Sequence, residues 1–148
     1  HTKGNQTIVV TSSLPFEGKS FTGIALAQMF HMLEKRTILI DLDLRKMSTS
    51  RQLGVSLNTQ GLSNILAKDD GLSLADLVIH LEDGFDLLPG GTIPPNPMEL
   101  ISRPMLESVM STLKSNYDIV IIDTPPVGLV SDAHLLLQYC DGTLLMAR

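Results

Sequence analysis

The stretch of residues 7–20, Thr-Ile-Val-Val-Thr-Ser-Ser-Leu-Pro-Phe-Glu-Gly-Lys-Ser, decides the fold of this chain. Residues 7–11 are apolar or β-branched and predict a buried strand, and a helical pattern begins with Lys19 and Ser20. Residues 13–20 match the phosphate-loop template G-x-x-x-x-G-K-[ST] with one departure, because Ser13 replaces the first glycine. In such a loop, backbone N–H groups and the start of the helix attract phosphate oxygens. The stretch therefore predicts a phosphate-binding loop between a strand and a helix.

The loop carries the residue types that binding of Mg·ATP requires. Gly18 lets the backbone approach the phosphates, Lys19 bridges the β- and γ-phosphates, and the Ser20 hydroxyl ligates Mg²⁺. A chance Gly-Lys-Ser tripeptide at a helix start is the alternative, and the strand–loop–helix context argues against it. ATP and Mg²⁺ are the predicted cofactors, and the predicted nucleotide-binding residues are Ser13, Pro15, Phe16, Glu17, Gly18, Lys19, Ser20 and Phe21.

Short, continuously apolar runs predict strands that are buried on both faces of a parallel sheet. Four runs are clear and a fifth, at 85–88, is weaker; the four are 7–11, 37–40, 118–122 and 142–147. Helical patterns lie between them, so strands and helices alternate. We therefore expect one domain over residues 1–148 with a P-loop NTPase-type α/β fold. This fold is an open, mostly parallel sheet with helices on both faces, here truncated at its C-terminus.

Apolar spacing and capping residues predict where helices pack and end. Two helices carry one apolar stripe each, at i, i+3, i+4 and i+7: Leu26, Met29, Phe30, Leu33 and Leu106, Val109, Met110, Leu113. Residues 96–99, Asn-Pro-Met-Glu, predict a helix start with Asn as N-cap and Pro at the first position. Residues 102–104, Ser-Arg-Pro, predict the end of that helix and the start of the next.

Aspartates follow two of the predicted strands. Asp41 and Asp43 end the run at 37–40, and Asp123 ends the run at 118–122. Aspartate often ends a strand as a turn residue, but three carboxylates at one sheet edge repel one another unless a cation or protons compensate. Asp123 matches the Walker B role beside Mg²⁺, and one of Asp41 and Asp43 would orient or deprotonate a nucleophile. Asp41 and Asp43, two apart, would share one side of a continuing strand.

Composition and charge exclude several other classes of function. The net charge of −5 gives no electrostatic basis for binding nucleic acid. The single cysteine, Cys140, excludes an intrachain disulfide and suits a reducing compartment. No apolar run reaches the roughly 20 residues that a membrane span needs. We read the chain as soluble and, by default, cytoplasmic.

Assembled in order, these residues resemble the bacterial tyrosine kinases of polysaccharide export, called BY-kinases. Residues 11–20 match their Walker A motif, and residues 40–45, Ile-Asp-Leu-Asp-Leu-Arg, match Walker A′. Residues 94–100, Pro-Pro-Asn-Pro-Met-Glu-Leu, match a further family segment, and residues 118–126 match Walker B. Related partition and division-site ATPases usually carry a second, signature lysine in the loop, which is absent from residues 14–16, Leu-Pro-Phe.

The resemblance implies ATP-dependent phosphorylation of tyrosine, including autophosphorylation between subunits of a ring, in the control of polysaccharide polymerisation and export. Lys19 and Asp41 would be catalytic, Asp41 by activating the tyrosine hydroxyl. The metal ligands would be Ser20, Asp43 and Asp123. The implied partners are ATP, further copies of the chain, a membrane-anchored activator or chain-length regulator segment, and protein tyrosine substrates, but no nucleic acid. The implied location is cytoplasmic, at the inner face of the bacterial plasma membrane.

Three segments of the family are not found in this sequence: the tyrosine-rich C-terminal tail, the last helix and strands of the sheet, and an N-terminal helix with a subunit-contact motif. The sequence therefore predicts the core of a longer kinase domain. Two alternatives remain open at this stage. One is an ATPase switch of the partition or division-site type, and the other is a nucleotide-binding regulatory module without kinase activity.

Overall fold

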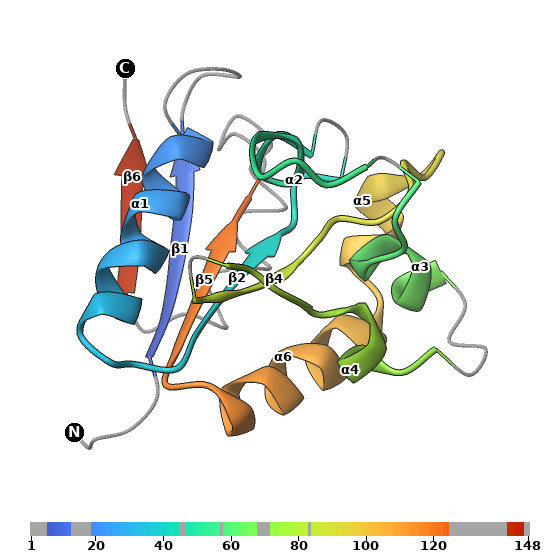
Figure 1. The fold of residues 1–148 in the computed structure, drawn as a ribbon. Helices are drawn as coiled ribbons and strands as arrows, with labels where there is room; N and C mark the ends of the chain where they lie inside the picture. Colours follow the sequence, from blue (N-terminus) through green and yellow to red (C-terminus); the bar gives the residue numbers. More distant parts are fainter. Residues whose placement is uncertain are drawn as a thin grey trace.

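The computed structural model describes residues 6–12, 19–44, 47–56, 58–67, 72–82, 84–124 and 142–146. For residues 11, 12, 19–21, 48, 98 and 142–146 the description covers the backbone alone. Figure 1 shows the arrangement of these segments, with a sheet between layers of helices. The three-layer α/β architecture expected from the sequence is confirmed.

Six strands form one sheet in the order β3-β4-β2-β5-β1-β6. All neighbouring pairs are parallel except β3 and β4, which are antiparallel. The phosphate-loop strand therefore lies between β5 and β6, inside the sheet. The bounds of the strands are β1 Gln6–Ser12, β2 Thr37–Asp41, β3 Ile79–His80, β4 Asp86–Leu88, β5 Ile119–Asp123 and β6 Gly142–Met146.

All five predicted strands are present within one or two residues of their expected bounds. The sequence did not predict β3, which has only two residues and pairs with β4 through Ile79 and His80. Two residues are too few to show an apolar or alternating pattern. Strand β3 is formed by its pairing with the edge of β4, so it can be recognised only when the sheet is present.

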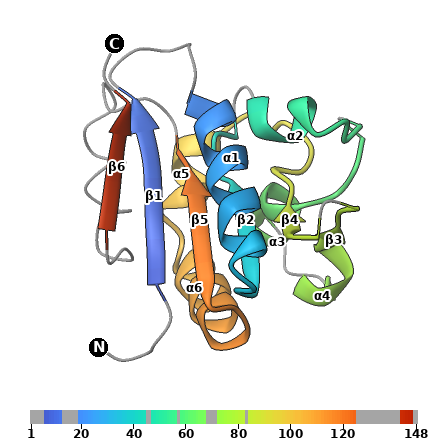
Figure 2. The same cartoon turned by 60° about the vertical axis from the view of Figure 1, so that its left-hand side comes forward.

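The helices cover the two faces of the sheet (Figures 1 and 2). Their bounds are α1 Lys19–Met32, α2 Ser48–Gln52, α3 Leu62–Ala67, α4 Leu74–Leu77, α5 Pro97–Ile101 and α6 Pro104–Asn116. On one face, Leu39 and Ile121 pack with Ala27 of α1. On the other, the alternate residues of the same strands pack with α3, α5 and α6. Successive strand residues point to opposite faces, which divides the core in two.

The apolar pattern predicted the packed face of α6 fully and that of α1 in part, since Leu26 and Phe30 of α1 pack against the core. Leu106, Val109, Met110 and Leu113 of α6 are all buried, as expected. In contrast, Met29 is 45% exposed and Leu33, just beyond the end of α1, is 60% exposed. The α1 face that meets the sheet also carries Ala27 and Gly23, and a Cβ at Gly23 would lie 3.5 Å from Leu39 Cδ1. Close approach of helix and sheet thus selected small residues, which the spacing of large ones could not reveal.

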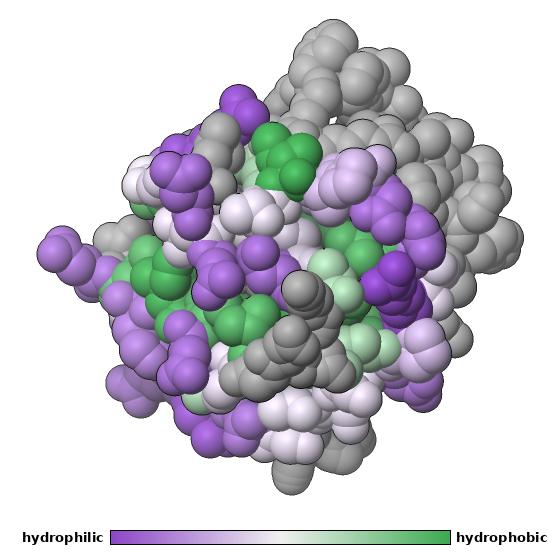
Figure 3. Space-filling model, turned by 90° about the vertical axis from the view of Figure 1, so that its right-hand side faces the viewer, coloured by the Kyte–Doolittle hydropathy of each residue, from purple (hydrophilic) through white to green (hydrophobic). Residues whose placement is uncertain are grey.

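The exposed large apolar side chains of the described residues are Met29, Met32, Leu33 and Ile93. Figure 3 shows the side of the molecule that carries α3 and α4, where apolar residues form separate areas between hydrophilic side chains. In the described part of the chain, no helix is both long enough and apolar enough to cross a bilayer.

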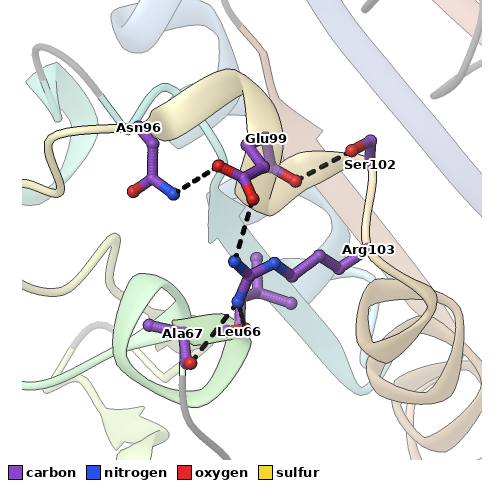
Figure 4. Close-up of polar contacts among 6 residues, drawn as sticks. All are labelled: Leu66, Ala67, Asn96, Glu99, Ser102 and Arg103. Atoms are coloured by element: carbon purple, nitrogen blue, oxygen red, sulfur yellow. Dashed lines mark hydrogen bonds and ion pairs between the residues drawn. The ribbon is translucent and has the colours of Figure 1, made fainter.

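The junction between α5 and α6 ends one helix and starts the next, as the sequence predicted, and it is held by side chains (Figure 4). Asn96 occupies the N-cap position of α5, and its Nδ2 donates to Glu99 Oε1 at 2.9 Å rather than accepting from the helix backbone. Glu99 also pairs with Arg103 Nη2 at 3.2 Å. Arg103 Nη1 donates to the carbonyl oxygens of Leu66 and Ala67, at 3.2 and 3.4 Å. One guanidinium therefore joins the last turn of α3 to the start of α6.

We predict that Arg103→Ala lowers the free energy of unfolding by about 1 kcal/mol, because two helix-terminal carbonyl groups lose a charged donor. Urea denaturation followed by circular dichroism measures the change. Lys114→Ala on α6 is the matched control, since the Lys114 side chain forms no hydrogen bond or ion pair with the other described residues, and it should leave stability within about 0.5 kcal/mol. Equal losses in the two variants would contradict the prediction.

Candidate active site

Two buried carboxylates lie side by side at the carboxyl edge of the sheet. Asp41 is the last residue of β2 and Asp123 the last residue of β5, and the sheet register pairs them directly. Both are fully buried. Residues at the same register of parallel strands point to the same face, and strand axes are about 4.8 Å apart. The alternation along β2 and β5 puts both side chains on the face of Leu39 and Ile121, which α1 covers.

The phosphate-loop motif lies at this same edge. Strand β1 ends at Ser12, and its Val10 pairs with Asp123 in the register with β5. The described chain resumes at Lys19, the first residue of α1. Figure 2 shows the first turn of α1 at the end of the sheet where the tips of β1 and β5 lie. The carboxylates and the start of α1 therefore share one end of the sheet and one of its faces.

Helix α2 supplies hydrogen-bond donors to both carboxylates. The Thr49 hydroxyl donates a hydrogen bond to Asp123 Oδ2. Ser50 donates twice to Asp41 Oδ2, from its backbone N at 2.9 Å and from Oγ at 2.5 Å. Ser50 is the third residue of α2, so Asp41 accepts from a first-turn N–H in the way an N-cap side chain does. The two strand ends and α2 are thereby tied together.

The family comparison adds to this geometry. The profile of the AAA domain family matches residues 6–140. A putative tyrosine-protein kinase in the cps region of Klebsiella pneumoniae is 36% identical over 97% of this chain, and the tyrosine-protein kinase YwqD of Bacillus subtilis is 38% identical over 95% of it. Among solved structures, the VpsO kinase domain is 37% identical with a TM-score of 0.87 and covers 95% of this chain, which spans 68% of that domain. The chain belongs to the bacterial tyrosine-kinase family.

The chain matches only part of the length of these relatives. The chain spans 20% of the length of the Klebsiella relative and 59% of the Bacillus relative. The kinase domain of the Escherichia coli tyrosine kinase ETK is 35% identical with a TM-score of 0.89, and the chain spans 56% of it. The septum site-determining protein MinD of Pyrococcus horikoshii, solved with Mg-ADP, has a TM-score of 0.79 at 24% identity, which shows a shared fold alone.

Two features of this site, its burial and the nearby negative charges, change the pKa of the Asp41 carboxyl group. Burial first, and then the charge of Asp123, raise the pKa of Asp41 to about 7, while the hydrogen bonds from Ser50 oppose the rise. Its Oδ1 is buried and has no hydrogen-bond partner among the described residues. A buried carboxylate oxygen without a partner is costly, unless a ligand completes the site.

Asp43 belongs to the same cluster, although the local structure differs from the expectation. Strand β2 ends at Asp41, so Asp43 does not continue the strand, and the chain turns through a Leu44 N to Leu42 O hydrogen bond of 3.0 Å. The side chain is nevertheless buried, and its charge contributes to the raised pKa of Asp41. Proximity in the fold, rather than strand alternation, brings Asp43 to the site.

Several predicted site residues lie outside the described part of the structure. Lys19 and Ser20 are placed as the first two residues of α1, followed by Phe21, without their side chains. The loop residues Ser13, Pro15, Phe16, Glu17 and Gly18 fall outside the described residues altogether. Within the described residues, no three His, Cys, Asp or Glu side chains lie close enough to hold a metal ion by themselves. The metal ligands Ser20, Asp43 and Asp123 therefore stay a prediction.

The hydroxyl donors Thr49 and Ser50 were not among the residues predicted from the sequence. The available signal was the run Ser48-Thr49-Ser50, which comes a few residues after the Walker A′ aspartates. Met47, the residue before α2, is buried in the left-handed conformation with φ 51°, which is uncommon for a non-glycine residue. That conformation turns the chain so that α2 faces the carboxylates. The sequence around Met47 contains no residue pattern that predicts this left-handed conformation.

The raised pKa of Asp41 predicts a pH dependence of stability. Between about pH 4 and pH 7 the folded protein holds a proton on Asp41 that the unfolded chain releases, so the free energy of unfolding falls as the pH rises through this window. Asp41→Asn keeps the side-chain shape and removes the titrating group, so its free energy of unfolding should fall less over this pH window than that of the wild-type protein. The difference between the two proteins should be a few kcal/mol at most. Urea denaturation in EDTA at pH 4.5, 6 and 8 measures the slope.

The exposed Asp76 of α4 offers a matched control, because Asp76→Asn removes a carboxylate far from the cluster. This variant should keep the pH slope of the wild-type protein. If Asp41→Asn also keeps that slope, the assigned pKa of Asp41 is wrong.

Proposed function

We propose that residues 1–148 are the core of an ATP-dependent protein-tyrosine kinase domain that transfers the γ-phosphoryl group of Mg·ATP to a tyrosine hydroxyl. The observation that carries the proposal is the buried pair Asp41 and Asp123 at the end of the sheet where the phosphate-loop motif leads into α1. Asp41 Oδ1, buried without a partner in the described part of the chain, is an acceptor that a substrate hydroxyl could use. The names of the relatives supply the class of reaction.

The proposed division of roles follows from the chemistry of each side chain. Lys19 would bind the phosphates, and Ser20, Asp43 and Asp123 would hold Mg²⁺ directly or through water. The other residues around the nucleotide would be Ser13, Pro15, Phe16, Glu17, Gly18 and Phe21. A divalent cation fits the cluster, because the charges of Asp123 and Asp43 raise the pKa of Asp41 and a compensating positive charge would offset that repulsion. When bound, Mg²⁺ would neutralise charge on the phosphates.

The transfer itself needs positioning and charge neutralisation more than covalent chemistry by the protein. The bond that forms joins the phenolic oxygen of tyrosine to the γ-phosphorus. The bond that breaks joins the γ-phosphorus to the bridging oxygen of ADP, which leaves with the electron pair. Asp41 accepts the phenolic proton, in the proposed role of general base.

The wider setting of the domain is part of the proposal. We infer that the full-length protein assembles as a ring that phosphorylates its own tyrosines, next to a membrane-anchored activator or chain-length regulator segment. The inner face of the bacterial plasma membrane would be its location, and control of polysaccharide polymerisation or export its role. The resemblance of the four motifs to the kinases of polysaccharide export supports this setting, as does the name of the Klebsiella relative, which places that protein in a cps region.

The first test is phosphotyrosine detection by mass spectrometry after incubation of the full-length protein with Mg·ATP. We predict that Lys19→Met abolishes phosphotyrosine, because the phosphates lose their cation. Lys114→Met, at the far end of α6, is the control and should keep wild-type phosphorylation. Normal phosphorylation by a folded Lys19→Met protein would refute the role of the loop. Release of inorganic phosphate without phosphotyrosine in the wild-type protein would instead indicate an ATPase switch.

The proposed metal ligands make a separate prediction. Mg·ADP should raise the midpoint of thermal unfolding of the wild-type protein, because it binds the folded state alone. The rise should be smaller by half or more in Asp43→Asn and Asp123→Asn, and unchanged in the control Asp76→Asn. Differential scanning fluorimetry with and without Mg²⁺ measures it. If the two site variants gain as much as wild type, Asp43 and Asp123 do not hold the metal.

A further inference from the structure

The backbone amide and the hydroxyl of Ser50 take part in three hydrogen bonds that orient the Asp41 carboxylate or the hydroxyl bonded to it. Its backbone N and its Oγ both donate to Asp41 Oδ2, at 2.9 and 2.5 Å. The Gly90 backbone N donates to Ser50 Oγ at 3.2 Å. Ser50 is 3% exposed, so water does not compete freely for these bonds. Ser50 therefore holds one carboxylate oxygen directly, and Gly90 acts on that carboxylate through the Ser50 hydroxyl.

The Gly90 bond sets the direction of the Ser50 hydroxyl. A hydroxyl has one proton to donate and two lone pairs to accept with. Because the Gly90 N–H occupies a lone pair, the single proton of Oγ is left to point at Asp41. The two oxygens of Asp41 are then no longer equivalent: Oδ2 accepts two hydrogen bonds, and Oδ1 accepts none from the described residues.

We propose that Ser50 is a positioning residue that locks the Asp41 carboxylate with Oδ1 facing the incoming tyrosine hydroxyl. The side-chain torsion that turns an aspartate carboxylate is broad, so an unrestrained carboxylate presents either oxygen. Two donors on Oδ2 remove that freedom and leave Oδ1 to orient the phosphoryl acceptor. Catalytic groups held by such neighbours are presented in one geometry before the substrate arrives. The inference deepens the proposed kinase function and rests on it.

The support for Ser50 extends into the segment after β4. The Gly90 carbonyl accepts from Ser63 N at 2.8 Å, and the Pro89 carbonyl accepts from Leu62 N at 2.9 Å, so the start of α3 fixes this segment. A Cβ at Gly90 would lie 3.0 Å from Met47 Cγ and Sδ. Glycine at this position thus lets the backbone amide come close to α2. The same segment continues toward residues 94–97, Pro-Pro-Asn-Pro, which ties that motif to the site through the backbone.

The test uses the full-length protein and a tyrosine peptide as phosphoryl acceptor. Ser50→Ala removes the hydroxyl, Ser50→Thr keeps it, and Ser50→Cys keeps the volume with a weak donor. The matched control is Ser63→Ala, since Ser63 is equally buried and its Oγ donates to the Thr92 carbonyl at 2.5 Å, away from the carboxylates. The kcat, the KM for ATP and the Kd for Mg·ADP are measured for each variant.

We expect Ser50→Ala to lower kcat by about 10-fold to 100-fold, the range typical for losing a residue that orients an active-site group. The KM for ATP and the Kd for Mg·ADP should change by less than about twofold, because the amide and hydroxyl of Ser50 bond to Asp41 and Gly90 among the described residues, and neither is a predicted nucleotide ligand. Ser50→Cys should also lose kcat, whereas Ser50→Thr and Ser63→Ala should stay near wild type. In parallel, hydrogen exchange should show a less protected Gly90 amide in Ser50→Ala.

Each other outcome is decisive. A wild-type kcat in Ser50→Ala, or in Ser50→Cys if the alanine variant does not fold, overturns the positioning role. An equal loss in Ser63→Ala, or a loss that appears in KM and Kd instead of kcat, assigns the effect to packing and overturns it as well. If the wild-type protein binds Mg·ADP but phosphorylates no tyrosine, the proposed kinase function fails, and the inference fails with it.

Discussion

The repulsion between Asp41 and Asp123 is the constraint around which the carboxyl edge of the sheet is organised. The register of β2 and β5 places these buried carboxylates side by side, and the pKa of Asp41 shows the cost. A fold selected for stability alone would place apolar residues at both positions, as it does at 38–40 of β2 and 119–122 of β5. The donors of α2 reduce this cost without removing it. The site is therefore arranged for a ligand that brings positive charge.

The elements around the pair are short, and their positions depend on it. Helix α2 has five residues and would not form alone in water, because a short helix gains too few hydrogen bonds to offset nucleation. Its first turn is held by the side chains that Asp41 and Asp123 present. Binding of a ligand to the carboxylates must therefore be felt by α2. The site and its nearest helix form one unit.

The sequence predicted those parts of the fold and site that local pattern encodes. Buried parallel strands are continuous apolar runs, so β1, β2 and β5 and their terminal aspartates could be read directly. The α5–α6 junction was readable because proline and asparagine act locally. In contrast, the two-residue β3, the left-handed Met47 and the donors Thr49 and Ser50 depend on partners distant in the chain. Their roles appear only once tertiary contacts are formed.

The position of β1 also bears on the order in which the chain can fold. In the described structure, β1 pairs only with β5 and β6, and 114 positions separate Thr124 from its hydrogen-bond partner Val10. During synthesis, β1 leaves the ribosome before β5 and β6, so its sheet neighbours form only after residue 119 and those that follow it have been made. Strands β2 and β4 can associate earlier, whereas the strand before the phosphate loop waits exposed. Long-range pairing of this kind slows folding and lengthens the time during which apolar segments such as Ile8–Val10 are open to misassociation.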